Sequence, residues 1–208
     1  MYTPRFNQVS DRATLIEAMQ AYSFAILFGP LDPSAEAAAH RATHLPLVVR
    51  DEGPHGVLEG HFAKANAHWQ SLANRETLVV FPGPHSYVSP SLYAEELSVP
   101  TWNYIAIHAC GTLELIEDET AKDALLAGLI QANEPAYAEQ WRNLPDGFRR
   151  TMRAGIVGFR IPITRIEGKF KISQNRPEAD RRAVRAAHSA GTSDQQQLAS
   201  WMKRLIEC

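Results

Sequence analysis

The sequence predicts a mixed α+β fold, mainly β, in which antiparallel strands are accompanied by peripheral helices. Short loops join most of the β-branched and aromatic runs, which suits antiparallel pairing because parallel pairs need long crossovers. A sheet of few strands can hide its edges by closing into a small barrel. The chain has 208 residues, 45% hydrophobic and 21% charged, as is typical of a globular protein. We expect one domain over residues 1–188 and a C-terminal helix within 189–208 that packs on it or on a partner subunit.

Composition also bears on where the protein works. Two cysteines, Cys110 and Cys208, are too few for a disulfide scaffold or a four-thiolate zinc site. Charged residues interrupt the N-terminal segment, so we expect no signal peptide. The longest apolar run, residues 24–28, is far shorter than a membrane span. These features favour a cytoplasmic protein that does not bind membranes.

The N-terminal elements follow from capping and proline chemistry. A helix is expected after Ser10, a good N-cap residue, because apolar positions then recur at helical spacing. A buried strand at residues 23–28 and a loop at residues 31–40 follow. The next strand, residues 43–50, contains Pro46. Because proline cannot donate to a ladder, we expect this strand at a sheet edge or with a bulge.

The remaining elements are assigned by the same patterns. Strands are expected at residues 56–62, 77–81, 87–89, 102–109, 112–116, 155–166 and 169–173, with a proline break at residues 82–84. Helices are expected at residues 67–73 (capped by Asn66), around 124–130, 137–141, 145–153, 181–187 and 194–206, with a helical turn at Pro90.

Charge is unevenly distributed along the chain. Residues 149–185 contain eleven Lys or Arg and three acids, a net charge of +8, whereas the remainder of the chain is −10. The segment could bind a polyanion or a phosphate. We favour a surface that pairs with the acidic remainder, because a basic footprint over the whole domain is missing.

Common catalytic and nucleotide-binding motifs are absent from the sequence. Neither a P-loop nor a G-x-G-x-x-G string occurs, and there is no G-x-S-x-G nucleophile elbow. His40 and His44 have helical spacing but lack the metalloprotease glutamate, so no metal site is predicted. No catalytic residue can be assigned.

Three polar clusters lie where expected strands end. At residues 60–69 a strand leads into a helix start, where backbone N–H groups, Lys64 and Asn66 suit a phosphate; a plain capped helix is the alternative. Residues 83–93 and 99–104 bring together four aromatic rings and His85, which suit a planar ligand or pin a loop to the core or to a partner. The amides and guanidinium of residues 171–176 suit a heterocycle or a carboxylate, or cap a helix.

Six strings, in order along the chain, together carry a family resemblance. They are Thr43-His44-Leu45-Pro46-Leu47, Gly60-His61-Phe62 with Asn66 and Trp69, Gly83-Pro84-His85 with Tyr87 and Ser89, Val99-Pro100-Thr101-Trp102-Asn103-Tyr104, Gly155-Ile156-Val157-Gly158-Phe159, and Lys171-Ile172-Ser173-Gln174-Asn175-Arg176. From its first residue to about Arg182, the chain resembles the PaiB family of FMN-binding negative transcriptional regulators.

The resemblance implies an FMN-binding split β-barrel that forms a homodimer with the flavin at the interface. Thr43, His44, Leu45 and Pro46 would present backbone to the isoalloxazine edge, with Pro46 breaking the ladder. The ribityl phosphate would be held by His61, Phe62, Lys64 and Asn66. The residues expected from across the dimer are Tyr87, Trp102, Asn103, Gln174, Asn175 and Arg176.

The implied role is that of a flavin-dependent regulator. One alternative is an FMN-dependent oxidoreductase in which Tyr87, Trp102 and Arg176 hold a small planar substrate over the flavin. Another is a haem-binding protein on the same barrel, with His61 or His85 as ligand. Direct DNA binding is not expected, because the overall charge is −2 and no helix-turn-helix signature is evident.

Overall fold

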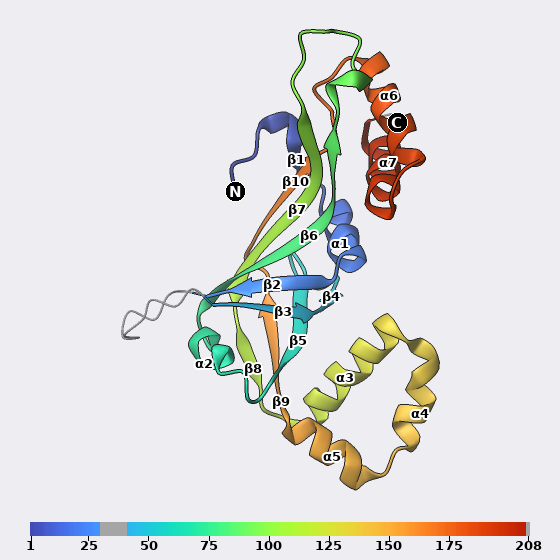
Figure 1. The fold of residues 1–208 in the computed structure, drawn as a ribbon. Helices are drawn as coiled ribbons and strands as arrows, with labels where there is room; N and C mark the ends of the chain where they lie inside the picture. Colours follow the sequence, from blue (N-terminus) through green and yellow to red (C-terminus); the bar gives the residue numbers. More distant parts are fainter. Residues whose placement is uncertain (30–40, 207–208) are drawn as a thin grey trace. The chain divides into compact units, whose positions relative to one another are not determined.

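The computed structural model describes residues 1–29 and 41–206 (Figure 1). The chain divides into two compact units. Unit 1 comprises Met1–Leu15, Pro82–Ile107 and Glu167–Cys208, and unit 2 comprises Ile16–Phe81 and His108–Ile166. Within the described residues, no helix is long and apolar enough to span a membrane.

Two antiparallel sheets and seven α-helices make up the described fold. The strands are β1 (Gln8–Val9), β2 (Phe24–Phe28), β3 (Ala42–Pro46), β4 (Val48–Arg50), β5 (Val57–Ala63), β6 (Glu76–Val88), β7 (Thr101–Thr112), β8 (Glu114–Ile116), β9 (Ile156–Pro162) and β10 (Arg165–Lys171). The helices are α1 (Arg12–Ala21), α2 (His68–Leu72), α3 (Glu119–Asn133), α4 (Ala138–Asn143), α5 (Asp146–Ala154), α6 (Glu178–Ser189) and α7 (Ser193–Ile206), with short 3-10 turns at Arg5–Asn7, Pro90–Leu92 and Pro135–Tyr137. The predicted mixed α+β class with antiparallel sheets is confirmed.

Unit 1 is a sheet with its C-terminal helices packed on one face. The strands neighbour one another in the order β1-β10-β7-β6, with Gln8 of β1 opposite Lys169 of β10. Figure 1 shows α6 and α7 together beside these strands. Trp201 of α7 stacks on Phe170 of β10 at 5.1 Å between ring centroids, and Gln195 donates to Ser86 of β6 at 3.0 Å.

Unit 2 contains the larger share of the core. One run of neighbours is β6-β2-β3, and a second sheet has the order β4-β5-β9-β8. Phe62 of β5 and Phe159 of β9 are fully buried, with ring centroids 5.0 Å apart. Helix α3 covers the other face of this second sheet, where its Leu125 and Leu129 pack with Val48.

Proline positions account for the clearest differences from the predicted elements. The single strand expected at residues 43–50 is two strands in different sheets, β3 and β4, because the chain leaves the first ladder after Pro46. The edge position of β3 is confirmed. The break expected at residues 82–84 is wrong, because β6 runs without interruption from Glu76 to Val88. The φ that proline imposes is compatible with extended backbone.

Smaller differences concern element ends. Asp11, not Ser10, caps α1, because its carboxylate accepts from the backbone N–H of Thr14 at 2.8 Å. The strand expected over residues 155–166 ends at Pro162, and β10 begins at Arg165, four residues earlier than expected. The loop expected at residues 31–40 lies outside the described residues.

Candidate functional site

In unit 2, three polar side chains join β3 to α2. The hydroxyl of Thr43 lies 2.8 Å from Nδ1 of His68 and accepts from the amide of Asn66 at 3.3 Å. The carbonyl oxygen of Asn66 accepts from the backbone N–H of His68 at 3.1 Å. His68 is buried, and its ring meets Phe62 edge-on. Burial, and then the positive charge of Arg41, lower the pKa of His68, so the ring is neutral at pH 7.

The local sequence explains this arrangement. Alternation along β3 turns Thr43 and Leu45 to one face and His44 and Pro46 to the other. Asn66 follows the end of β5, and its side-chain oxygen accepts from the backbone N–H of His68. The expected Asn66 cap is wrong, because Ala67 is the N-cap residue of α2 and no side chain caps this helix. In the strand order β3 is terminal, so one edge of its backbone has no neighbouring strand among the described residues. An edge of this kind can hydrogen-bond a planar ligand.

Two cations flank this cluster. Arg41 precedes Thr43 by two residues, and Lys64 precedes Asn66 by two; both are exposed. Neither forms an ion pair with another described residue. The sequence predicts Lys64 as a site residue but contains no signal that singles out Arg41 or His68. Their role depends on the approach of β3 to α2, which no local pattern reveals.

The remaining residues of the predicted phosphate site have separate surroundings. Phe62 belongs to the core. His61 points to the opposite face of β5; burial lowers its pKa, and its Nδ1 is buried without a hydrogen-bond partner among the described residues. The backbone N–H of Lys64 donates to Gly155 at 2.9 Å, and that of Asn66 to Ala63 at 2.8 Å. Those two amides are therefore engaged within the chain.

The outer face of the β2, β3 and β6 strands in unit 2 is apolar and open. Phe24 is 59% exposed and stacks on His44 at 6.1 Å. The cross-strand partners on this face are Phe24 with Pro46, Ile26 with His44 and Val80, and Phe28 with Ala42 and Leu78. None of these side chains is fully buried. The exposed apolar residues on this face are cross-strand neighbours and not singly scattered over the surface.

In unit 1, the structure brings Tyr87 and Trp102 together. Their rings meet edge-on at 6.3 Å, and His85 lies 5.7 Å from Trp102. Trp102 is 51% exposed and Tyr87 is 49% exposed. Asn103, the next residue of β7, is instead buried and pairs with Ser173 at 3.0 Å. Two aromatic faces are therefore available to a planar ligand, whereas Asn103 supports the sheet.

The string at residues 174–176 forms the turn after β10. Gln174 accepts from the backbone N–H of Ile172 at 2.8 Å and donates to the carbonyl of Phe170. Arg176 stacks on the ring of Tyr93 at 3.9 Å. Asn175 is exposed. Gln174 therefore shapes the turn, and Asn175 presents its side chain to solvent.

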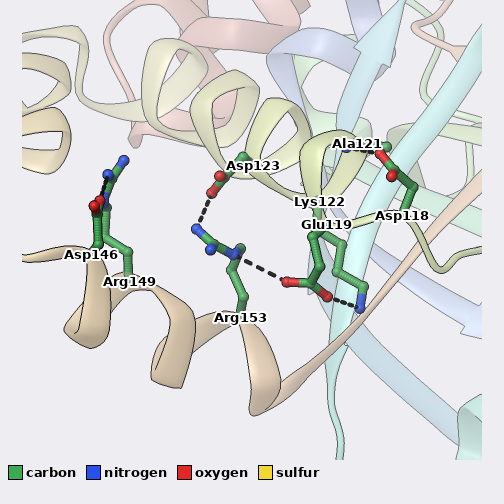
Figure 2. Close-up of polar contacts among 8 residues, drawn as sticks. All are labelled: Asp118, Glu119, Ala121, Lys122, Asp123, Asp146, Arg149 and Arg153. Atoms are coloured by element: carbon green, nitrogen blue, oxygen red, sulfur yellow. Dashed lines mark hydrogen bonds and ion pairs between the residues drawn. The ribbon is translucent and has the colours of Figure 1, made fainter.

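A further pocket in unit 2, of about 410 Å³, lies where α3 meets the second sheet. Its charged walls pair with each other: Arg50 with Glu59 at 2.9 Å and Arg160 with Glu114 at 2.7 Å. Beside it, Arg153 of α5 bridges two acids of α3, Glu119 at 3.2 Å and Asp123 at 2.6 Å, as Figure 2 shows. These pairs account for two arginines of the basic run that begins at Arg149, namely Arg153 and Arg160.

Comparison with known proteins identifies the family. Residues 1–165 match the family described as "Putative FMN-binding domain". The chain belongs to this family. A relative from Bacillus subtilis, "Protease synthase and sporulation protein PAI 2", is 34% identical over 182 residues, covering 86% of this chain and 85% of the relative. The resemblance to the PaiB family is thereby confirmed, and the family's cofactor is FMN.

Solved structures share the fold at low sequence identity. The flavocytochrome Anf3 from Azotobacter vinelandii aligns with a TM-score of 0.63 at 15% identity, covering 81% of this chain and 72% of that one. An FAD and heme binding protein from Mycobacterium smegmatis aligns with a TM-score of 0.58 at 17% identity, covering 79% and 73%. At such identities the similarity supports the fold alone.

Proposed function

We propose that the protein is a homodimeric FMN-binding split-barrel protein that acts as a flavin-dependent regulator. The observation that carries the proposal is the family match together with the cluster at β3 and α2. A regulatory role is supported by the 34% identical relative, whose name refers to protease synthase and sporulation. When bound, FMN supplies redox chemistry that the side chains of the chain cannot.

The residues of unit 2 fit the cofactor in two respects. The free edge of β3, from Thr43 to Pro46, offers backbone groups to the isoalloxazine ring. Arg41 and Lys64, which have no carboxylate partner among the described residues, offer positive charge to the ribityl phosphate. Two cations without a counter-ion favour a dianionic group. The engaged amides of Lys64 and Asn66 leave this task to the side chains.

The phosphate proposal is tested by fluorescence titration with FMN. The double variant Lys64→Ala and Asn66→Ala, and the single variant Arg41→Ala, are each expected to bind FMN roughly tenfold or more weakly, because each loses a charge-assisted contact. The matched control is Arg150→Ala, which removes an exposed arginine elsewhere in unit 2. Unchanged affinity in both test variants would move the phosphate to another site.

The homodimer is supported by the open apolar face of β2, β3 and β6. Phe24, Phe28 and Pro46 are exposed on it, and a second copy would bury them in a twofold interface. In that dimer we propose that Tyr87, Trp102 and Arg176 of one copy reach the flavin of the other. Light scattering of the FMN-bound protein should return twice the 23.1 kDa chain mass. A monomer mass would contradict the shared site.

A second candidate is an FMN-dependent oxidoreductase, favoured by the exposed rings of Tyr87 and Trp102. The visible spectrum of protein purified without added cofactor separates the possibilities. Flavin bands support the proposal, and bleaching by NADH or NADPH adds a reductase activity. A Soret band would instead indicate haem, with His61 or His85 as the candidate ligand.

Regulation is proposed to act without specific DNA binding by the isolated protein. The arginines of α6 are engaged within the chain: Arg182 pairs with Glu178, and Arg181 donates to the carbonyl of Arg176 at 2.8 Å. An electrophoretic shift assay with genomic fragments at physiological salt should show no sequence-selective complex, with or without FMN. A nanomolar complex that is lost in the double variant Arg181→Ala and Arg182→Ala would overturn this.

A further inference from the structure

Three cations at the end of β10 and in the turn after it are not accounted for by the ion pairs of the basic segment. Lys169, Lys171 and Arg176 form no ion pair with any carboxylate in the part of the chain that the structure describes. Three arginines earlier in the segment, Arg149, Arg153 and Arg160, do have such partners. All three unpaired cations belong to unit 1, on or directly after β10.

Lys169 is the most deeply placed of the three, at 9% exposed. Its ammonium donates to the carbonyl of Tyr2 at 2.9 Å and lies 5.5 Å from the Tyr2 ring and 5.3 Å from the Tyr104 ring. These contacts orient the charge but do not neutralise it. A buried ammonium without an anion is costly, so an anion bound beside Lys169 would offset that cost.

Lys171 stands on the same side of β10, two residues further along. Its ammonium bonds to the hydroxyl of Thr101. Burial, followed by the positive charges of Lys169 and Arg176, lowers the pKa of Lys171. The local field at this face is therefore positive, and an anion placed here would be stabilised.

Aromatic rings share this face of the sheet. On β7, Trp102 and Tyr104 alternate with the buried Asn103 and Ile105, so the two rings point away from the core. On β6, His85 and Tyr87 alternate in the same way with buried neighbours. Helix α7 packs on the other face, through Phe170 and Ser86. The open face thus presents rings on β6 and β7 and ammonium groups on β10.

We propose that this open face of unit 1 binds a planar aromatic anion. The aromatic ring of the ligand stacks on Trp102 and Tyr87, and its carboxylate or phosphate lies against Lys169 and Lys171. Neighbouring strands lie about 4.8 Å apart and same-face residues on one strand about 7 Å apart, and one aromatic ring with an anionic substituent covers such spans. The binding site rests on unit 1 alone; only its use as the substrate site of a flavoprotein rests on the proposed function.

The test is isothermal titration calorimetry on the full chain as purified, with its FMN content measured by absorbance. The probes are 2-aminobenzoate for a carboxylate and adenosine 5′-monophosphate for a phosphate. Their neutral counterparts are 2-aminobenzamide and adenosine. At least one anionic probe should bind tenfold or more tightly than its neutral counterpart. Whichever probe binds identifies the anionic group. Binding of neither, or equal binding of the neutral counterparts, overturns the proposal.

Variants separate the role of charge from that of stacking. Lys171→Ala should weaken binding of the anionic probe tenfold or more, and Lys171→Arg should restore the affinity to within threefold. Trp102→Ala should weaken binding of the anionic and neutral probes alike. Lys203→Ala, an exposed lysine of α7, is the control. Lys171 is chosen because Lys169 is buried and its loss could unfold the sheet. An unchanged Lys171→Ala titration overturns the proposal.

A parallel FMN titration keeps the two proposals distinct. Lys171→Ala should bind FMN as the unaltered chain does. The double variant Lys64→Ala and Asn66→Ala should bind FMN roughly tenfold or more weakly and bind the probe unchanged. If Lys171→Ala loses FMN instead, the face belongs to the flavin, and a separate anion site is refuted. If the chain binds the probe but no FMN, the proposed function fails and this site stands.

Discussion

Replacing Thr43 by valine tests whether the polar cluster holds β3 to α2. Valine keeps the branched shape and suits a strand, but it removes the hydroxyl. That hydroxyl accepts from Asn66 at 3.3 Å and shares a hydrogen bond of 2.8 Å with Nδ1 of His68. The substitution therefore leaves two polar groups without their partner while changing the packing little.

The expected cost follows from the surroundings of the two groups. His68 is 4% exposed, so water cannot readily replace the lost partner. A buried polar atom left unpaired costs about 1–3 kcal/mol. Asn66 is half-buried and can turn toward water, so it adds little. We expect Thr43→Val to lower the free energy of unfolding by about 2 kcal/mol. Thr43→Ser keeps the hydroxyl and loses one half-buried methyl, at about 0.5 kcal/mol.

Urea unfolding followed by circular dichroism at pH 7.5 measures the difference. The valine variant should unfold at a lower midpoint than the serine variant, with the same dependence on denaturant. A valine variant as stable as the serine variant would refute the reasoning, because the hydroxyl would then contribute nothing. If Thr43→Ser lowered the urea midpoint as much as Thr43→Val or more, the effect would come from the methyl group and not from the hydroxyl.

Three further outcomes are expected. Burial lowers the pKa of His188, so on acidification the unfolded chain takes up this proton before the folded chain does. The contribution of neutral His188 to stability is therefore fully present above pH 6.5 and is lost as the pH falls below it. The urea midpoint should fall less steeply with decreasing pH in His188→Leu than in the unaltered chain. A Cβ at Gly111 would lie 2.2 Å from the carbonyl of Pro162, so Gly111→Ala should lower the free energy of unfolding by about 3 kcal/mol, and a change below about 0.5 kcal/mol would contradict that clash. Phe62→Ala should cost about 3–5 kcal/mol in the same assay, because it empties a fully buried site beside Phe159.

Most elements could be predicted because their signals are local. Helices α3 and α7 follow from apolar spacing, and β2 follows from a run of apolar residues. The continuity of β6 through Pro82 and Pro84 could not be predicted. Proline removes a donor, but whether a donor is needed at that position depends on which neighbour the strand has. Sequence alone does not show the neighbour.

The residues of the candidate site could likewise be predicted only in part from the sequence. Motif order identified Thr43 and Asn66, and the structure brings them within hydrogen-bond distance. The motif could not show which side of β3 faces α2. That side gives Thr43 a polar partner on α2, and His44 lies on the apolar outer face. His68 was missed because its importance arises from a tertiary contact 25 residues away in the sequence.

The basic segment shows why a charge run has to be resolved into pairs before it is interpreted. Its first part, represented by Arg153 and Arg160, pairs with acids from α3 and β8, as the acidic remainder of the chain predicts. Its last part includes Arg182, which pairs within α6. Lys169, Lys171 and Arg176, on β10 and in the turn after it, have no such partner among the described residues. A net charge of +8 overstates the free positive charge of the segment, and its unpaired part lies beside exposed aromatic rings. That juxtaposition favours a small aromatic anion over duplex DNA, because duplex binding needs many phosphate contacts.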